Sequence, residues 1–385
     1  MKGLKLNSGA IFYEKGAPGL DRRLLILTIA LSVFGTLMII SAGEAYASFR
    51  YSDPLFFPKR QLIWLTVGII TMILASKIRP SVYRAITPYL YVITLILLVA
   101  VLIFGMVGNG AQRWISIGPI TIQPSEIAKL SIVMALASYF EKHGELALDG
   151  KSRRNSFLFG TLFPCLIMGV PIILVMLEKH LSCIIILGII GLLLIIASGA
   201  DAKYIGIFAL VAVVLVLALA LFTDYTKDRI TVWQNPEAYK LTGGWQTLQG
   251  LMAIGSGGLF GLGYGNGIMK LCYVSEPAND MIFAIICEEL GFFGALFTLL
   301  LFLLTVARGF TLALRAEGVF ERLVTFGVTT KIATQALLNV AVVTNTIPNT
   351  GISLPFFSYG GSSLIMLFFE IGMLLSFSRG ARITK

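Results

Sequence analysis

A carboxylate stands where the chain's long polar stretch, about residues 223–278, gives way to an apolar run. Asp280 follows Pro277-Ala278-Asn279 and directly precedes Met281. A helix dipole favours a carboxylate at its N-terminus, so Asp280 could be a plain helix cap, although Asn279 could cap equally well. The other interpretation is that Asp280 is the reactive group of the protein.

A second cluster of polar residues opens another apolar run. Its sequence is Gln123-Pro124-Ser125-Glu126, with Lys129 three residues later. Proline is tolerated in the first turn of a helix and serine caps well, so the pattern predicts a helix start. Glu126 and Lys129 share one helix face, and pairing lowers the cost of burying them. They are either an ion pair that holds helices together or one wall of a binding site.

Arg113 and Trp114 lie upstream, in a loop rich in Gly and Pro. An arginine beside an aromatic residue can hold a phosphate or a sugar. The same pair can also anchor the chain at a membrane interface. Both interpretations stay open on these residues alone.

Lys331, Gln335 and Asn339 recur every four residues and therefore share one helix stripe. Lys331 lies nine residues past Arg322, about 13 Å along a helix axis, which is too deep for easy snorkelling. We expect Lys331 to pair with a carboxylate inside the bundle, and Glu370 and Glu288 are the candidates.

Residues 345–363 predict a turn and then a helix whose first half is irregular. Pro355, Ser362 and Ser363 lie in this small-sided part. Broken backbone at membrane depth occurs only where it borders protein or a wet cavity. We therefore expect a groove here, which Glu126, Lys129, Asp280 and Ser362 would share if their helices adjoin.

These elements belong to a membrane protein. The 385 residues are 57% hydrophobic and only 13% charged, whereas soluble domains carry about 25% charged residues. The first apolar run, 24–40, is longer than the roughly 7–15 residues of a signal-peptide core, so we expect a first span and not a cleaved leader.

The predicted fold is all-α, a polytopic integral membrane protein with ten transmembrane helices, because only helices satisfy the backbone at this length and hydrophobicity. A single membrane domain, 23–378, lies between tails 1–22 and 379–385, with a large extracytoplasmic loop, 223–278, between helices 7 and 8. The predicted spans are 23–42, 60–76, 86–106, 125–141, 156–177, 182–200, 204–222, 279–307, 321–347 and 352–378.

Lys and Arg concentrate in the short segments that lie inside when the N-terminus is placed inside. This bias predicts that both termini are cytoplasmic and that the long loop is outside. The net charge of +10 is then a topology signal and does not indicate nucleic-acid binding.

The glycine-rich run that contains Gly257, Gly261 and Gly265 has neither the G-x-G-x-x-G nor the P-loop spacing, which excludes those nucleotide sites. Its four-residue repeat suits a short helix packed tightly on another, and the alternative is a re-entrant or surface-lying segment. The four cysteines show no C-x-x-C spacing, so neither a disulfide framework nor a zinc site is indicated.

Together these residues resemble the SEDS family (shape, elongation, division and sporulation), which includes FtsW, RodA and SpoVE. The resemblance covers nearly the whole chain. Its motifs are Arg113-Trp114-Ile115, Gln123-Pro124-Ser125-Glu126 with Lys129-Leu130, the block 280–291, and Pro348 with Gly351-Ile352-Ser353-Leu354-Pro355-Phe356 through Ser363. The stretch 345–351 is closer to division or sporulation members than to elongation members.

One stretch departs from the family pattern. Many members carry Gln-Pro-Asp-Leu-Gly after the fifth span, where this chain has Glu178-Lys179-His180-Leu181-Ser182. A role of that motif in ligand binding is therefore not carried over to this chain.

The resemblance implies an enzyme of the bacterial plasma membrane that polymerises lipid II into peptidoglycan glycan strands at the outer face. It implies that Asp280 is the family's essential acidic residue and that Glu126 and Lys129 are its charged pair in the fourth span. The implied partners are a class B penicillin-binding protein (a transpeptidase), lipid II and membrane lipid, and no nucleic acid.

We expect Asp280 to accept the proton of the 4-hydroxyl of an acceptor GlcNAc, whose oxygen displaces undecaprenyl pyrophosphate from the donor MurNAc and forms a β-1,4 bond. Arg113, Lys129 or a divalent cation (Mg²⁺ or Mn²⁺) would offset the pyrophosphate charge. We expect Lys129 also to hold Asp280 ionised. The other expected substrate-binding residues are Trp114, Gln123, Ser125, Glu126, Pro355, Ser362 and Ser363.

Two rival functions fit part of the pattern. A lipid II flippase would also need charges within the membrane and a cavity of broken helices, but Asp280 is predicted at the outer lip and transporter sites lie near the midplane. A non-catalytic scaffold for the transpeptidase would tolerate loss of the Asp280 carboxylate.

Overall fold

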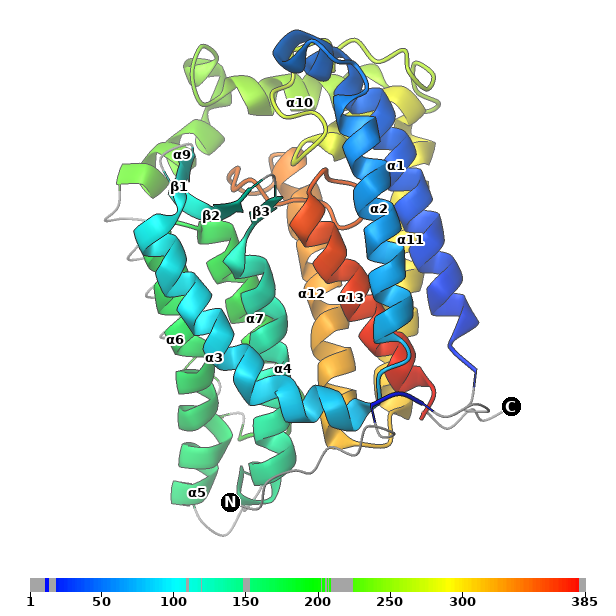
Figure 1. The fold of residues 1–385 in the computed structure, drawn as a ribbon. Helices are drawn as coiled ribbons and strands as arrows, with labels where there is room; N and C mark the ends of the chain where they lie inside the picture. The colour runs from blue at the N-terminus through cyan, green and yellow to red at the C-terminus, as the bar shows by residue number, and fades with distance from the viewer. Residues whose placement is uncertain are drawn as a thin grey trace.

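The computed structural model describes residues 11–13, 19–108, 111–118, 120–147, 153–201, 203–204, 206, 208 and 224–380. Figure 1 shows a bundle of helices with the long loop across one end. The elements before the loop are α1 (Arg22–Tyr51), α2 (Phe56–Ala75), α3 (Pro80–Phe104), β1 (Met106–Gly108), β2 (Ala111–Ile117), β3 (Ile120–Ile122), α4 (Pro124–Ala147), α5 (Arg153–Phe157), η2 (Leu158–Leu162), α6 (Phe163–Leu177) and α7 (Leu181–Ala197). The loop and later elements are α9 (Asp224–Gln234), η3 (Pro236–Tyr239), α10 (Trp245–Ser256), α11 (Ile282–Arg315), α12 (Val319–Val343) and α13 (Gly361–Ser378).

The prediction of a polytopic helical membrane protein is confirmed. Nine predicted spans coincide with described helices, with α5, η2 and α6 forming one of them, while predicted span 204–222 lies almost wholly outside the described residues. By length and composition, seven helices of the described chain can cross a membrane, and α7 is a shorter apolar helix. The count of ten stays a prediction.

The two ends of the bundle differ. The start of α1 and the end of α13 meet at one end, where the backbone N–H of Asp21 donates to Ser378 Oγ at 3.1 Å, and the long loop lies at the opposite end (Figure 1). We call the latter the loop end. Which end faces the cytoplasm stays a prediction.

A small antiparallel sheet, β1–β2–β3, connects α3 to α4 at the loop end. The sequence alternates apolar and polar residues on either side of Gly118, whose φ of 62° suits the turn between β2 and β3. These short strands stand where the Gly and Pro content of the sequence predicts only a loop. The strand β2 carries Arg113 and Trp114 and holds both in fixed positions.

The glycine-rich run is not a helix, so that expectation is wrong. The helix α10 ends at Ser256, and the following glycines at 258, 261, 263 and 265 have positive φ. A helix over this run would require negative φ values, and these four glycines do not have them. Instead, the run lies against the outer part of α11, where Gly291 breaks the helix with φ 65° and ψ −162°.

The glycine-rich run satisfies the backbone at this break. The N–H groups of Leu262 and Gly263 donate to the carbonyls of residues 288 and 289, each at 3.0 Å. The N–H groups of Phe292 and Phe293 donate to the carbonyls of residues 258 and 259 at 2.9 and 3.2 Å. A broken helix needs such partners, because unpaired peptide groups are costly away from water.

Two buried carboxylates fasten the same run from the side of α11. Glu289 pairs with Lys270 at 2.7 Å and accepts a hydrogen bond from Ser41 of α1. Glu288 accepts the backbone N–H groups of Ile268 and Met269 at 2.7 and 2.9 Å. The start of α11, and with it the preceding turn, is thereby held against the loop.

Candidate functional site

The long loop and several helix ends enclose a cavity of about 750 Å³, which we call the loop-side cavity. Residues of α2, β2, α4, α7, α9, α10, α12 and α13 line it, together with the turns before α11 and α13. Its charged lining residues are Arg60, Arg113, Glu126, Lys129, Asp228, Arg229, Glu276 and Asp280. This mixture of cations and carboxylates suits a polar ligand that carries an anionic group.

Asp280 lies in the turn before α11 and faces this cavity. Its carboxylate accepts hydrogen bonds from Gln246 Nε2 at 3.3 and 3.4 Å, and its backbone carbonyl accepts one from Asn339 at 2.8 Å. Because α11 begins without a side-chain cap, the helix-cap interpretation is not supported. Burial, and after it the negative charge of Glu276, raises the pKa of the Asp280 carboxyl to about 6.

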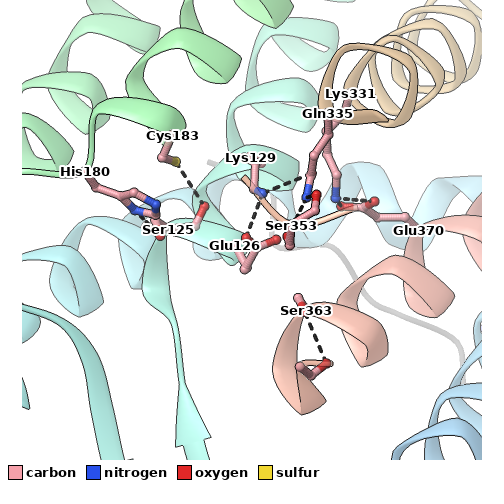
Figure 2. Close-up of polar contacts among 11 residues, drawn as sticks. Ser125, Glu126, Lys129, His180, Cys183, Lys331, Gln335, Ser353, Ser363 and Glu370 are labelled. Carbon is pink, nitrogen blue, oxygen red and sulfur yellow. Dashed lines mark hydrogen bonds and ion pairs between the residues drawn. The ribbon is translucent and has the colours of Figure 1, made fainter. Parts of the chain in front are cut away.

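Glu126 and Lys129 form the ion pair that their spacing predicts. The Lys129 Nζ lies 2.7 Å from Glu126 Oε1, and both side chains are buried in the first turns of α4 (Figure 2). Lys129 also donates to Gln335 Oε1 at 3.3 Å. Since both residues line the loop-side cavity, the pair is structural and at the same time part of the site wall.

The polar stripe on α12 connects this ion pair to the turn that holds Asp280. The Nζ of Lys331 lies 2.6 Å from both carboxylate oxygens of Glu370, which confirms the expected internal pair and selects Glu370 over Glu288. Gln335 donates to the Ser353 carbonyl at 3.1 Å. Asn339 donates to two backbone carbonyls, one of them that of Asp280.

The predicted direct support of Asp280 by Lys129 is not found. The described hydrogen bonds of Lys129 go to Glu126 and Gln335, and the charges that act most on Asp280 are those of Glu276 and Arg229. The connection runs through α12, whose residues 335 and 339 lie one helical turn apart. The described contacts therefore connect Lys129 to Asp280 only indirectly, through α12.

The residues predicted upstream of α4 lie at the same cavity. Arg113, Trp114 and Gln123 all line it. The Nη2 of Arg113 donates to the Lys179 carbonyl at 2.5 Å, which ties β2 to the turn before α7. The sequence patterns for Asp280, the α4 pair and β2 thus converge on one cavity.

Three other predicted residues lie elsewhere. Ser125 is fully buried beside the cavity, and Pro355 lines a smaller cavity of about 20 Å³ that borders both Glu126 and Lys331. Ser362 lines neither cavity, and its hydroxyl is buried without a described partner. Ser363 lines both and donates to the Gly360 carbonyl at 3.1 Å.

Several lining residues were missed by the sequence reasoning. Arg60 and Trp64 extend the wall along α2, and Arg229 and Gln246 extend it from the long loop. Trp233 is a sequence signal that the loop docks on the rest of the protein, because the N–H of an indole in a polar loop needs a hydrogen-bond partner. Its Nε1 donates to the Asn345 carbonyl at 2.9 Å and so docks α9 on the turn before α13.

In the departing stretch 178–182, His180 and Ser182 line the loop-side cavity, whereas Glu178 does not. Glu178 is 1% exposed, and neither carboxylate oxygen has a described hydrogen-bond partner. Burial raises the pKa of Glu178 to about 8, against the opposing effect of Arg113. At neutral pH this side chain is therefore mostly uncharged.

Replacing Glu178 with glutamine should stabilise the protein, and more at about pH 8 than at about pH 5. The folded protein keeps a proton that the unfolded chain releases above its ordinary pKa of 4.5, so each pH unit from there to about 8 costs the fold on the order of 1.4 kcal/mol. Glutamine removes this cost. Thermal unfolding midpoints of both proteins at both pH values measure the effect, and equal midpoints at the higher pH would contradict it.

Of the four carboxylates that line the cavity, Glu276 and Asp280 are the pair that would hold a divalent cation. The described chain has no group of three or more His, Cys, Asp or Glu side chains that could hold a metal alone. Asp280 and Glu276 line the same cavity, and their mutual repulsion contributes to the raised pKa of Asp280. Mg²⁺ and similar ions are commonly held by one or two carboxylates together with substrate phosphates, so these residues fit such an ion.

Comparison with known proteins gives a consistent result. The family model described as "Cell cycle protein", FtsW/RodA/SpoVE, matches residues 22–383. Stage V sporulation protein E of Bacillus subtilis is 36% identical over 364 residues, 94% of this chain and 98% of that protein. A probable peptidoglycan glycosyltransferase FtsW of Trichlorobacter lovleyi is 34% identical over 366 residues, 94% of each.

Two solved structures share the fold. A chain of a peptidoglycan synthase complex, studied for the coordination of polymerization and crosslinking, has a TM-score of 0.77 at 26% identity and matches 95% of this chain and 99% of its own length. The Thermus thermophilus rod-shape-determining protein RodA has a TM-score of 0.69 at 26% identity, with coverage of 94% and 98%. Sporulation and rod-shape proteins both occur among the matches, so the division or sporulation subtype stays a prediction.

Proposed function

This chain belongs to the SEDS family of FtsW, RodA and SpoVE and is a peptidoglycan glycosyltransferase; from that premise we propose that it polymerises lipid II with Asp280 as general base. The observation that carries the proposal is the position of Asp280. Its carboxylate faces the largest described cavity, accepts only weak hydrogen bonds from Gln246, and has a pKa close to neutrality.

In this mechanism the Asp280 carboxylate takes the proton of the acceptor's GlcNAc 4-hydroxyl as its oxygen attacks the anomeric carbon of the donor MurNAc. The bond to undecaprenyl pyrophosphate breaks in the same displacement, which inverts the α-linked donor to a β-1,4 bond. A base with a pKa near the working pH is efficient, because it is ionised and still accepts a proton readily. The hydrogen bond from Asn339 to the Asp280 carbonyl fixes the turn from which the carboxylate projects.

The leaving pyrophosphate requires positive charge. Arg113 and Lys129 line the cavity from β2 and α4, and each is already oriented, by the Lys179 carbonyl and by Glu126 respectively. Preoriented charges stabilise a transition state without reorganisation. A divalent cation, if bound by Asp280 and Glu276, would offset further charge on the pyrophosphate.

The rate of polymerisation should fall as the pH drops through about 6, because the base must be ionised. Well below that value the loss should approach tenfold per pH unit. Initial rates measured from about pH 5 to pH 8 test this. Replacing Glu276 with glutamine should shift the acid limb to lower pH, since its negative charge raises the pKa of Asp280. A flat profile from pH 5 to 7 would refute the assignment.

The cavity lies at the loop end, opposite the start of α1 and the end of α13. This supports an outward-facing site in the bacterial plasma membrane with both termini in the cytoplasm. In this proposal the site opens toward the side on which lipid II is exposed. A class B penicillin-binding protein is the proposed partner, supported by the likeness to a chain of a synthase complex that couples polymerization and crosslinking.

A further inference from the structure

His180 stands at the N-cap position of α7, in the stretch that departs from the family pattern, and lines the loop-side cavity. Its Nδ1 lies 3.2 Å from the hydroxyl of Ser125 in the first turn of α4 (Figure 2). Ser125 is 0% exposed and does not line the cavity. The imidazole therefore bridges the buried start of α4 and the open space of the cavity.

Hydrogen-bond satisfaction fixes the tautomer of this ring. The Ser125 hydroxyl has no other partner in the described chain, so its proton must go to His180 Nδ1 or stay buried without an acceptor. An unpaired buried donor is costly. The favoured state has Ser125 donating to Nδ1, which leaves the ring proton on Nε2.

The Nε2 atom is reachable from the cavity. Nε2 makes no hydrogen bond within the described chain. The described chain has a small set of buried polar atoms without a partner, and Nε2 does not belong to that set. It is therefore accessible, and the loop-side cavity is the space that His180 lines. The protein presents one neutral N–H donor at this point of the wall.

The surroundings of His180 favour an anionic ligand. Burial, followed by the charges of Arg113 and Lys129, lowers the pKa of His180 to about 3, so the ring stays neutral at working pH. Both cations line the same cavity. Glu126 offsets the charge of Lys129, whereas Glu178, two residues away, is mostly uncharged, so the net charge of these groups around the ring is positive.

We propose that His180 binds the diphosphate of the lipid-linked substrate through Nε2–H, between Arg113 and Lys129, and that Ser125 is a positioning residue that fixes this tautomer. The inference rests on the proposed function for the identity of the ligand. The tautomer itself does not depend on it.

The tautomer can be read directly, because the chain has only two histidines. His143 Nδ1 lies 3.2 Å from the Tyr139 carbonyl, which can only accept, so His143 carries its proton on Nδ1. Nitrogen NMR of ¹⁵N-histidine protein in lipid nanodiscs should show the two opposite tautomers. In the variant His143→Gln, the only histidine ring signals that remain are those of His180. A His180 ring protonated at Nδ1 would overturn the proposal.

Diphosphate binding is tested in the same sample. Added undecaprenyl diphosphate should shift the Nε2 signal and bring ³¹P within dipolar range of it, whereas nanodiscs of phosphatidylglycerol alone should not. The change should be lost in Ser125→Ala if Ser125 fixes the tautomer. An Nε2 signal that does not sense the added diphosphate would refute the contact.

Kinetics separates this inference from the proposed function. His180→Leu should raise the KM for lipid II about 10- to 100-fold, as expected for loss of a hydrogen bond to a charged group, and His180→Gln should recover part of it. An unchanged KM in His180→Leu with active wild type would sink the inference alone. Wild type that binds diphosphate but makes no glycan would sink the proposed function alone.

Discussion

Replacing Asp280 with asparagine should reduce glycan polymerisation by about 10²- to 10⁴-fold, the range typical for loss of a general base. The amide keeps an oxygen that can accept from Gln246, and the carbonyl bonded by Asn339 is unchanged. The turn before α11 should therefore keep its shape. Rates of chain formation from purified lipid II, with the transpeptidase partner present, measure the effect.

A matched control is available at Asp53. This aspartate forms an exposed ion pair with Lys59 at 3.0 Å in the connection between α1 and α2, and it does not line the cavity. The same Asp→Asn change there should leave the rate within about twofold of wild type, since exposed pairs contribute little. If Asp280→Asn polymerised as fast as Asp53→Asn, the base assignment would fail.

Replacing Lys331 with methionine should destabilise the protein by about 3–5 kcal/mol, because it leaves the buried carboxylate of Glu370 without its partner. Both residues are at most 2% exposed, and Nζ contacts both carboxylate oxygens. The unfolding midpoint in detergent measures the loss. The double variant Lys331→Met with Glu370→Met should recover most of it, since a buried ion pair and a well-packed apolar pair have similar stability.

The exposed ion pair of Asp53 and Lys59 again supplies the control variant. Lys59→Met removes a lysine from an ion pair of similar length and should change stability by less than about 1 kcal/mol. Equal losses for Lys331→Met and Lys59→Met would show that burial does not decide the cost. A double variant no more stable than Lys331→Met would show that the uncompensated charge is not its cause.

Residue spacing along single helices is enough to predict the buried ion pairs and the polar stripe on α12. The three-residue spacing of Glu126 and Lys129 and the depth of Lys331 both translate into ion pairs, because an unpaired charge at that depth is too costly. The four-residue spacing of Lys331, Gln335 and Asn339 gives a stripe whose members all make polar contacts.

Features that depend on distant segments could not be predicted in this way. The partner of the Asp280 carboxylate is Gln246, on another helix 34 residues earlier. The break in α11 at Gly291 becomes understandable only when the backbone groups of residues 258–263 are seen to satisfy it. Ser125 and Ser362 looked equivalent as small polar residues near the site, but packing buries Ser125 against His180 and leaves the Ser362 hydroxyl without a described partner.

Hydrogen bonds of α12 connect the two sides of the site. Gln335 contacts Lys129 and the segment at Ser353, and Asn339 contacts that segment and the Asp280 turn. Lys129 on α4 and Asp280 before α11 are thus both held by hydrogen bonds with the same helix, α12. A catalytic geometry held this way costs little reorganisation during the reaction.

A glycosyltransferase joins lipid II units, whereas a flippase only moves them across the bilayer. An assay of purified wild-type protein, reconstituted in liposomes with the proposed transpeptidase partner and fluorescent lipid II, separates the two activities. We expect long glycan strands that are absent with Asp280→Asn. Translocation of lipid II without strands, or strands that persist in Asp280→Asn, would contradict the proposed function.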